Sequence, residues 1–191
     1  TGYGRSARPL PMNDPCNFLK EQQAQFVPKL IPAPCAPSQP TSITTMDSDW
    51  NDIAAVVDYL RALRNVDKVS LVAWSQGGSR TGGYVARNPS KVARIVALAP
   101  GYERTFPLEA PNPLPGRNGS MNAQSRADFV ANWDRQVGCP DQYDPAASAA
   151  IWSDMLASDP VGATWGTGVR RAPTVPTYGF NPTTVARIQT P

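Results

Sequence analysis

Histidine is absent from all 191 residues of the sequence. A serine nucleophile usually needs histidine as its adjacent base, and histidine is also a common metal ligand. Cysteine is scarce too, and Cys16, Cys35 and Cys139 follow no zinc-binding spacing. The residues therefore indicate no metal site and no cofactor, and any serine-based chemistry would need a base from elsewhere.

Clustered positive charge and long apolar runs are also lacking. The formal net charge is +3, but the basic residues are scattered and Arg170-Arg171 is their only adjacent pair. A nucleic-acid partner would need a basic cluster or stripe, which is not present. No apolar run approaches the roughly 20 residues that a helix needs to span a bilayer. We therefore expect neither a nucleic-acid partner nor a membrane span.

Proline is nearly missing from the middle of the chain. Of 21 prolines, only Pro89 lies between Thr41 and Ala99. Because proline interrupts both helices and central strands, this block is predicted to be regular structure, with loop-rich segments on either side.

The middle block reads as helix, strand, helix, strand. Apolar residues at helical spacing predict a helix from about Ser48 to Arg64. Lys68 to Trp74 is a β-branched and apolar strand whose composition predicts burial on both faces. A helix over Gln76–Asn88 and a strand over Arg94–Leu98 follow. The second helix is long enough for a crossover, so the block is predicted to be a parallel α/β unit.

The chain beyond Gly101 changes character and is predicted to be mainly helical. Tyr102 to Pro182 is expected to form a helical insertion over the α/β unit. Its helices are expected at Asn122–Gln136, at Pro145–Ala157 with Asp144 as cap, and from Asp159-Pro160 onward. A final helical turn is expected after the insertion, at Thr183–Ile188.

Ser75 is the residue with the clearest chemical meaning. Residues 71–78 read L-V-A-W-S-Q-G-G, an apolar run followed by one serine and the start of a helix. One large class of enzymes exposes its nucleophile on such a sharp strand-to-helix turn. The strained backbone needs small neighbours, which Ala73, Gly77 and Gly78 provide. The alternative is a serine that only begins a helix.

Several segments together resemble α/β-hydrolase-fold proteins. Residues 1–9, T-G-Y-G-R-S-A-R-P, resemble the turn after the fourth strand of that family, usually written D-x-R-G-x-G-x-S. Residues 73–77 resemble its nucleophile elbow, G-x-S-x-G, with alanine at the first position. Residues 90–100 are similar to its next strand, and residues 189–191 to the lead-in to the strand after its cap.

The resemblance implies an α/β fold class, in which this chain is a portion of an α/β-hydrolase parallel sheet with a helical cap insertion. Residues 1–101 would be the core portion, 102–182 the cap, and 183–191 the return to the core. In that family the catalytic acid and histidine follow the cap. We therefore expect both to come from sequence absent from this chain, so that the remainder of the fold, in the same polypeptide or a second chain, is its partner.

The resemblance also assigns roles to residues. Ser75 would be the catalytic nucleophile, and the backbone N–H of Gln76 would be an oxyanion donor. Trp74 and Tyr102 are candidate residues of a substrate pocket. Trp74 is expected to be a pocket wall or a core residue, with direct recognition of the substrate as the alternative. Glu103 lies where a minority of relatives place the catalytic acid, and a surface carboxylate is the alternative. Further aromatic candidates for the pocket, or for the core, are Trp133, Trp152, Trp165, Tyr178 and Phe180.

We therefore expect a serine hydrolase that cleaves a small-molecule carboxylic ester through an acyl-enzyme on Ser75. Two alternatives stay open: peptide, amide or carbon–carbon bond hydrolysis on the same fold, and a non-catalytic binding homologue. Epoxide hydrolases and haloalkane dehalogenases would carry aspartate at Ser75, so these activities are disfavoured.

Cys16 and Cys35 flank a proline-rich loop, and a disulfide between them is predicted. Two buried free thiols are the alternative, and Cys139 is left over or pairs outside the chain. A disulfide would favour an oxidising compartment, such as the periplasm or the extracellular space.

Overall fold

The chain folds into two compact units. The computed structural model describes residues 2–102, 120–139, 141–166, 168–172 and 180–191. One unit comprises Thr1–Ile43 and Gly116–Pro173, and the other comprises Thr44–Pro115 and Thr174–Pro191. Within the described ranges, no helix combines the length and the hydropathy needed to cross a membrane.

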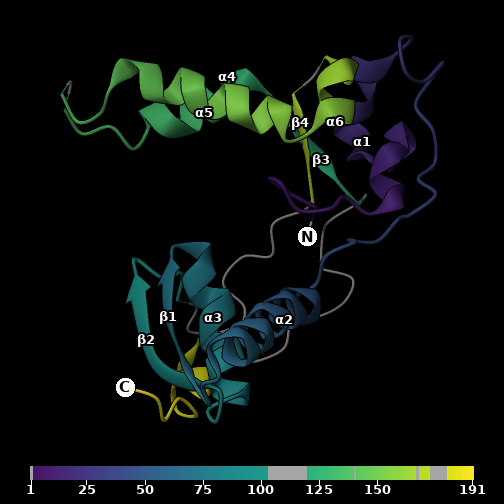
Figure 1. The fold of residues 1–191 in the computed structure, drawn as a ribbon. Coiled ribbons are helices and arrows are strands. Elements are labelled where there is room, and N and C mark those ends of the chain that lie inside the picture. Colours follow the sequence, from purple (N-terminus) through teal and green to yellow (C-terminus); the bar gives the residue numbers. More distant parts are fainter. Residues whose placement is uncertain (1, 103–119, 140, 167, 173–179) are drawn as a thin grey trace. The chain divides into compact units, whose positions relative to one another are not determined.

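The second unit contains the predicted parallel α/β block (Figure 1). Its elements are α2 (Met46–Arg64), β1 (Val69–Trp74), α3 (Gln76–Arg87), β2 (Val92–Leu98) and α7 (Pro182–Val185). Strands β1 and β2 pair in parallel, and α3 is the crossover that joins them. Trp74 pairs with Leu98, so both strands end at the same edge of the sheet. This arrangement confirms the helix, strand, helix, strand order.

Helix α2 begins and ends on residues suited to those positions. Thr45 and Ser48 form a reciprocal capping box that satisfies amides of the first turn. The predicted start at Ser48 is therefore two residues late, because Thr45 is the N-cap and the helix begins at Met46. At the other end Asn65 adopts φ 50°, the left-handed conformation common just after a helix.

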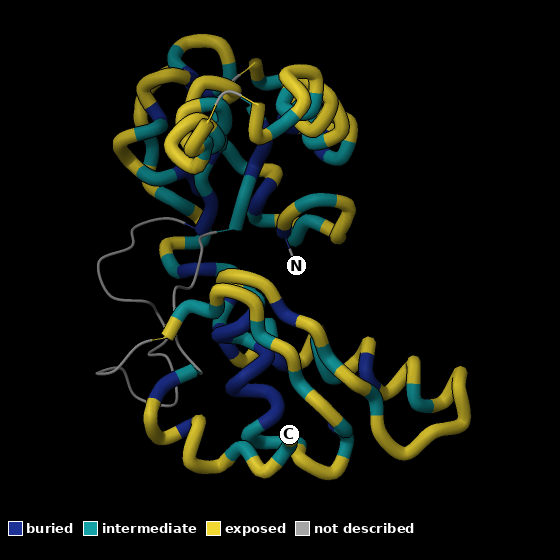
Figure 2. Tube along the Cα trace, turned by 90° about the vertical axis from the view of Figure 1, so that its left-hand side faces the viewer, coloured by how far each residue is buried: buried dark blue, intermediate teal, exposed yellow. Residues whose placement is uncertain are grey.

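The core of this unit lies where α2 and α3 pack on one face of the sheet. Its buried members are Met46, Trp50, Val57, Tyr84, Val85 and Val92. Helix α3 is buried from Gly78 to Val85 except for Arg80, and Figure 2 shows this stretch in dark blue. A Cβ at Gly83 would lie 2.6 Å from the Trp50 ring, so glycine is what lets the two helices approach.

The other face of the sheet is open, contrary to the prediction for the first strand. Val72 and Trp74 are 75% and 73% exposed, and Val96 and Leu98 on β2 are 51% and 54% exposed. The prediction was wrong because α2 and α3 cover only the face that carries Leu71 and its neighbours. Among the described residues nothing packs on the second face, although parallel sheets are normally covered on both.

The first unit is built from short helices and one small antiparallel sheet. Its elements are η1 (Leu10–Asn13), η2 (Pro15–Asn17), α1 (Lys20–Gln23), η3 (Ala24–Phe26), β3 (Asn122–Gln124), α4 (Arg126–Asp134), α5 (Pro145–Ala157), α6 (Pro160–Trp165) and β4 (Val169–Arg171). The helices α5 and α6 are capped by Asp144 and Asp159, as predicted.

The β3–β4 pair corrects one prediction. A helix was expected from Asn122, but residues 122–124 pair with residues 169–171 as antiparallel strands. The helix begins at Arg126 because Ser125 and Asp128 form a capping box there. Tertiary pairing and a strong local cap together override the helical pattern of the first few residues.

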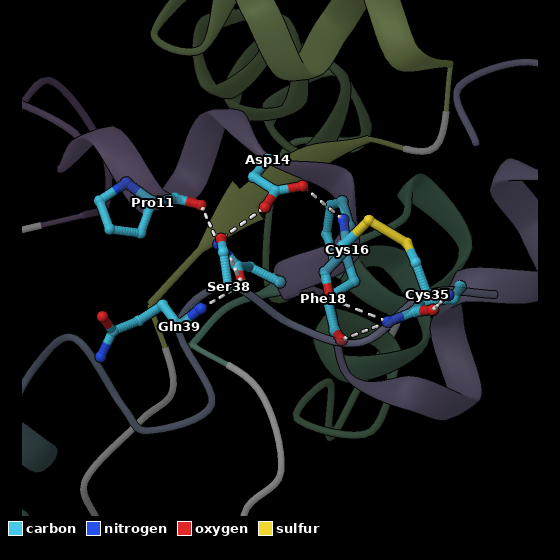
Figure 3. Close-up of a disulfide and its surroundings, with 9 residues drawn as sticks. Pro11, Asp14, Cys16, Phe18, Cys35, Ser38 and Gln39 are labelled. Carbon is cyan, nitrogen blue, oxygen red and sulfur yellow. Dashed lines mark hydrogen bonds between the residues drawn. A yellow bond between two sulfur atoms is a disulfide. The ribbon is translucent and has the colours of Figure 1, made fainter.

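A disulfide between Cys16 and Cys35 closes the N-terminal loop, as predicted (Figure 3). The two Cα atoms are 5.3 Å apart, and the cysteines have a sequence separation of 19. Asp14 fixes the same loop by accepting hydrogen bonds from the Cys16 amide and the Ser38 hydroxyl. Cys139 is unpaired and exposed.

Aromatic side chains fill two places in this unit. Trp165 packs edge-on against Phe18 and Phe26 of the core, at ring-centroid distances of 5.7 and 6.3 Å. Trp133 and Trp152 instead lie in an aromatic cluster between α4 and α5, each beside Phe129. Trp165 therefore serves the core, the alternative role foreseen for these residues.

A buried ion cluster ties the two ends of this unit together. The Asp159 carboxylate, fully buried, accepts hydrogen bonds at 2.7 Å from the Arg170 guanidinium and the Arg170 amide. Arg8 contributes a second cation, with its Nε 3.5 Å from Asp159. Burial alone raises the pKa of Asp159, but hydrogen bonds from Arg170 and the Gly162 amide lower it, and the net pKa lies below its ordinary value.

Candidate active site

Ser75 occupies the turn between β1 and α3. Its backbone has φ 53° and ψ −124°, a conformation that residues with a Cβ rarely adopt. The residue is exposed, at the edge where both parallel strands end. The sharp turn therefore presents the Ser75 side chain to solvent at the carboxyl edge of the sheet.

The Ser75 hydroxyl does not serve the helix that follows it. Ser75 is the N-cap of α3, a position where serine usually accepts a hydrogen bond from an amide of the first turn. Its side chain makes no such bond, because the positive φ turns it away from the helix start. This weighs against the reading of Ser75 as a simple helix-starting residue.

The Ser75 backbone is held by the end of the neighbouring strand. Its amide donates to the Leu98 carbonyl at 3.0 Å. Its carbonyl accepts from the amides of Gly78 at 2.9 Å and Gly101 at 3.3 Å. The turn is thus fixed at both its amide and its carbonyl, which is what a strained conformation needs in order to persist.

The glycines after Ser75 have different roles. A Cβ at Gly78 would lie 2.4 Å from the Cβ of Pro100, so α3 approaches the loop after β2 as closely as glycine permits. A Cβ at Gly77 would meet nothing within 4 Å. A side chain at Gly78 would therefore clash with Pro100, whereas one at Gly77 would not meet a neighbour.

Gln76 is the first residue of α3. The first four amides of a helix have no acceptor within it, and the helix dipole places partial positive charge there. The Gln76 N–H is therefore in the right element to stabilise negative charge that develops beside Ser75.

The structure describes some of the other predicted site residues and not others. Trp74 is on the open face of the sheet. Tyr102 is 45% exposed and contacts Phe180 edge-on, with ring centroids 5.5 Å apart. Phe180 in turn fills the space above Gly82 on α3. Glu103 and Tyr178 fall outside the described residues.

Ser79 and Gly101 were not predicted as site residues. The Ser79 hydroxyl donates to the Gly101 carbonyl at 2.9 Å, and Ser79 is 1% exposed. In the sequence, Gly101 marked only the point beyond which the chain changes character, and a serine inside a helix carries no signal of its own. Their pairing depends on the parallel register, which brings the two segments together.

Groups that could act as a base or hold a metal are sparse in the described structure. The chain has no histidine to accept the Ser75 proton. Among the described residues, no group of three or more His, Cys, Asp or Glu side chains could hold a metal ion. What these residues supply is an exposed serine on a strained turn whose backbone is held by hydrogen bonds.

One comparison with known proteins gives a match to this chain. A family model described as "Alpha/beta hydrolase family" matches residues 2–190. No curated protein matches the chain. The family match spans nearly the whole sequence and confirms the resemblance, and the parallel β1–β2 sheet agrees with part of that fold.

Proposed function

The chain belongs to the alpha/beta hydrolase family, and on that premise we propose that it is a serine hydrolase that cleaves carboxylic esters through Ser75. The observation that carries the proposal is the backbone of Ser75. Ser75 has a positive φ, its hydroxyl makes no capping hydrogen bond to the helix, and the residue is exposed at the end of a parallel strand. A serine that only begins a helix needs none of these.

The proposed reaction begins with attack of the Ser75 hydroxyl on the ester carbonyl carbon. The carbonyl oxygen becomes an oxyanion, and the Gln76 N–H donates to it as the charge develops. Collapse of this tetrahedral intermediate breaks the bond to the alcohol, which leaves with a proton. Water then attacks the acyl-enzyme in the same manner and releases the carboxylic acid.

A base must take the Ser75 proton, and this chain offers no histidine for it. We propose that a histidine and its carboxylate partner come from sequence outside residues 1–191, in the same polypeptide or in a second chain. Glu103 stays a weaker candidate for the acid. The Trp74 and Tyr102 side chains are proposed to border the bound substrate. Trp74 directly precedes Ser75, and Tyr102 directly follows Gly101, whose amide donates to the Ser75 carbonyl.

Turnover of matched substrates tests this proposal. The intact protein, with its histidine-bearing portion, should hydrolyse a p-nitrophenyl ester, and the corresponding p-nitroanilide more slowly. Ser75→Ala should reduce ester turnover by about 10⁴-fold or more, as loss of a triad nucleophile does. Ser70→Ala, a change on the same strand, is the matched control and should keep the parental rate.

Two outcomes would replace the proposal. Faster turnover of the anilide would favour amide hydrolysis on the same nucleophile. Absence of turnover by the intact protein on every ester and amide would favour the non-catalytic binding homologue.

A further inference from the structure

We infer that Ser79 is a positioning residue for the oxyanion donor of this site. The inference rests on the proposed function, because it names a residue that would act through the Gln76 N–H. It depends on a chain of three hydrogen-bonded groups, each of which the structure describes.

The first contact joins α3 to the loop after β2. The Ser79 hydroxyl donates to the Gly101 carbonyl at 2.9 Å. Ser79 is 1% exposed, so water does not compete for this bond. Because Gly78 lacks a Cβ, Pro100 can lie directly against the same turn of the helix. Gly101 is therefore held to α3 through its carbonyl.

The second contact joins Gly101 to the nucleophile. The Gly101 amide donates to the Ser75 carbonyl at 3.3 Å, and the Gly78 amide donates to the same oxygen at 2.9 Å. The amide and the carbonyl of Gly101 thus engage different residues of one turn, Ser75 and Ser79. Releasing the carbonyl from Ser79 would allow the Gly101 amide to move away from Ser75.

The third step follows from the planarity of the peptide bond. The Ser75 carbonyl and the Gln76 N–H belong to one trans peptide, in which the C=O and N–H point in opposite directions. Two donors that fix the carbonyl therefore also fix the direction of the Gln76 N–H. Ser79 acts on that direction through Gly101, without touching the substrate.

A purely structural role for Ser79 would have different consequences. A buried hydroxyl that only satisfies a carbonyl would affect stability when removed, with substrate and transition state bound as before. A positioning role affects the transition state more than the substrate, because the oxyanion exists only there. The two roles are separated by measurements on the site itself.

The test compares Ser79→Ala with Ser120→Ala in the intact protein. Ser120 is a matched control, because its hydroxyl is buried and has no hydrogen-bond partner among the residues that the structure describes. In Ser79→Ala, amide exchange at Gly101 should accelerate about tenfold, as expected when one supporting hydrogen bond is lost. The kcat for an ester should fall about tenfold with KM unchanged, and a boronic acid that mimics the oxyanion should bind about tenfold more weakly. Ser120→Ala should change none of these.

Ser79→Cys guards against a folding defect in the alanine variant. Its thiol fills similar space but is a weak donor, so its effects should have the same direction. Unchanged Gly101 exchange in the folded variants would overturn the inference, as would a rise in KM with boronic acid affinity unaltered. If the parent neither turns over esters nor binds the boronic acid, the proposed function fails, while Gly101 exchange still decides whether Ser79 positions the turn.

Discussion

Gly78 lies so close to Pro100 that a Cβ built on the glycine would be 2.4 Å from the Cβ of the proline. The contact presses the start of α3 against the loop whose Gly101 amide donates to the Ser75 carbonyl. The closeness of Gly78 to Pro100 therefore limits the space around the turn that contains Ser75. Backbone atoms of Pro100 are also near, with its Cα 2.9 Å from the built Cβ, so a rotamer change cannot relieve the overlap.

Gly78→Ala should lower the free energy of unfolding by about 1–3 kcal/mol, the usual cost of an overpacked site. Gly77→Ala is the matched control, because its added Cβ meets nothing within 4 Å. That change should leave stability the same or raise it by up to about 1 kcal/mol, since alanine favours the helix. Urea unfolding of both variants provides the comparison, and equal stabilities would contradict the role given to Pro100.

The buried ion cluster predicts a large effect at Asp159. Asp159→Asn removes the carboxylate that faces two cations, Arg8 and Arg170, and leaves both without their counter-charge. Breaking such a buried pair costs about 3–5 kcal/mol. Asp154→Asn is the control, because its ion pair with Arg5 is exposed and should be worth at most about 1 kcal/mol. Chemical denaturation measures the free energy of unfolding of the two variants, and similar losses in both would refute the prediction.

The same cluster predicts how stability depends on pH. The pKa of Asp159 is lower in the folded protein than in an unfolded chain, where it is about 3.9. The folded state therefore binds fewer protons, and the stabilisation from Asp159 is complete above pH ~4. It is lost as the pH falls through the lower folded pKa. Unfolding followed by aromatic fluorescence between pH 6 and 2 should show a loss that is smaller in Asp159→Asn; equal losses would exclude Asp159 as a source.

The Cys16–Cys35 disulfide should stabilise the first unit by restricting its unfolded state. For a loop of this length the chain-entropy model gives about 3 kcal/mol. A Cys16→Ser, Cys35→Ser double variant should lose about that amount in denaturant unfolding. Cys139→Ser, which alters an exposed unpaired thiol, should unfold like the parent. A non-reducing peptide map of the parent that finds Cys16 and Cys35 as free thiols would contradict the pairing.

The elements around Ser75 could be predicted from the sequence because local signals agree there. The helical spacing from Trp50 to Leu63, the β-branched run before Ser75 and the stop at Pro89 each indicate one structure. The serine between a strand and two glycines gave the nucleophile candidate. Cysteine placement on either side of one loop gave the disulfide.

The remainder depends on contacts between distant residues. The strand at Asn122–Gln124 exists because it pairs with residues 169–171, a partner that no local pattern near Asn122 reveals. Ser79 looks like any helical serine until the parallel register brings Gly101 beside it. The open face with Val72 and Trp74 was missed because composition reports how a strand suits burial and cannot say which elements cover it.

The most direct test of the account is covalent labelling of Ser75. The intact protein, treated with a fluorophosphonate and digested, should carry a single adduct on the peptide that contains Ser75, and Ser75→Ala should carry none. Residues 1–191 alone, which contain no histidine, should react far more slowly, and addition of the proposed histidine-bearing portion should restore the rate. An adduct on another serine of the intact protein, or no adduct at all, would contradict the assignment of Ser75 as the nucleophile.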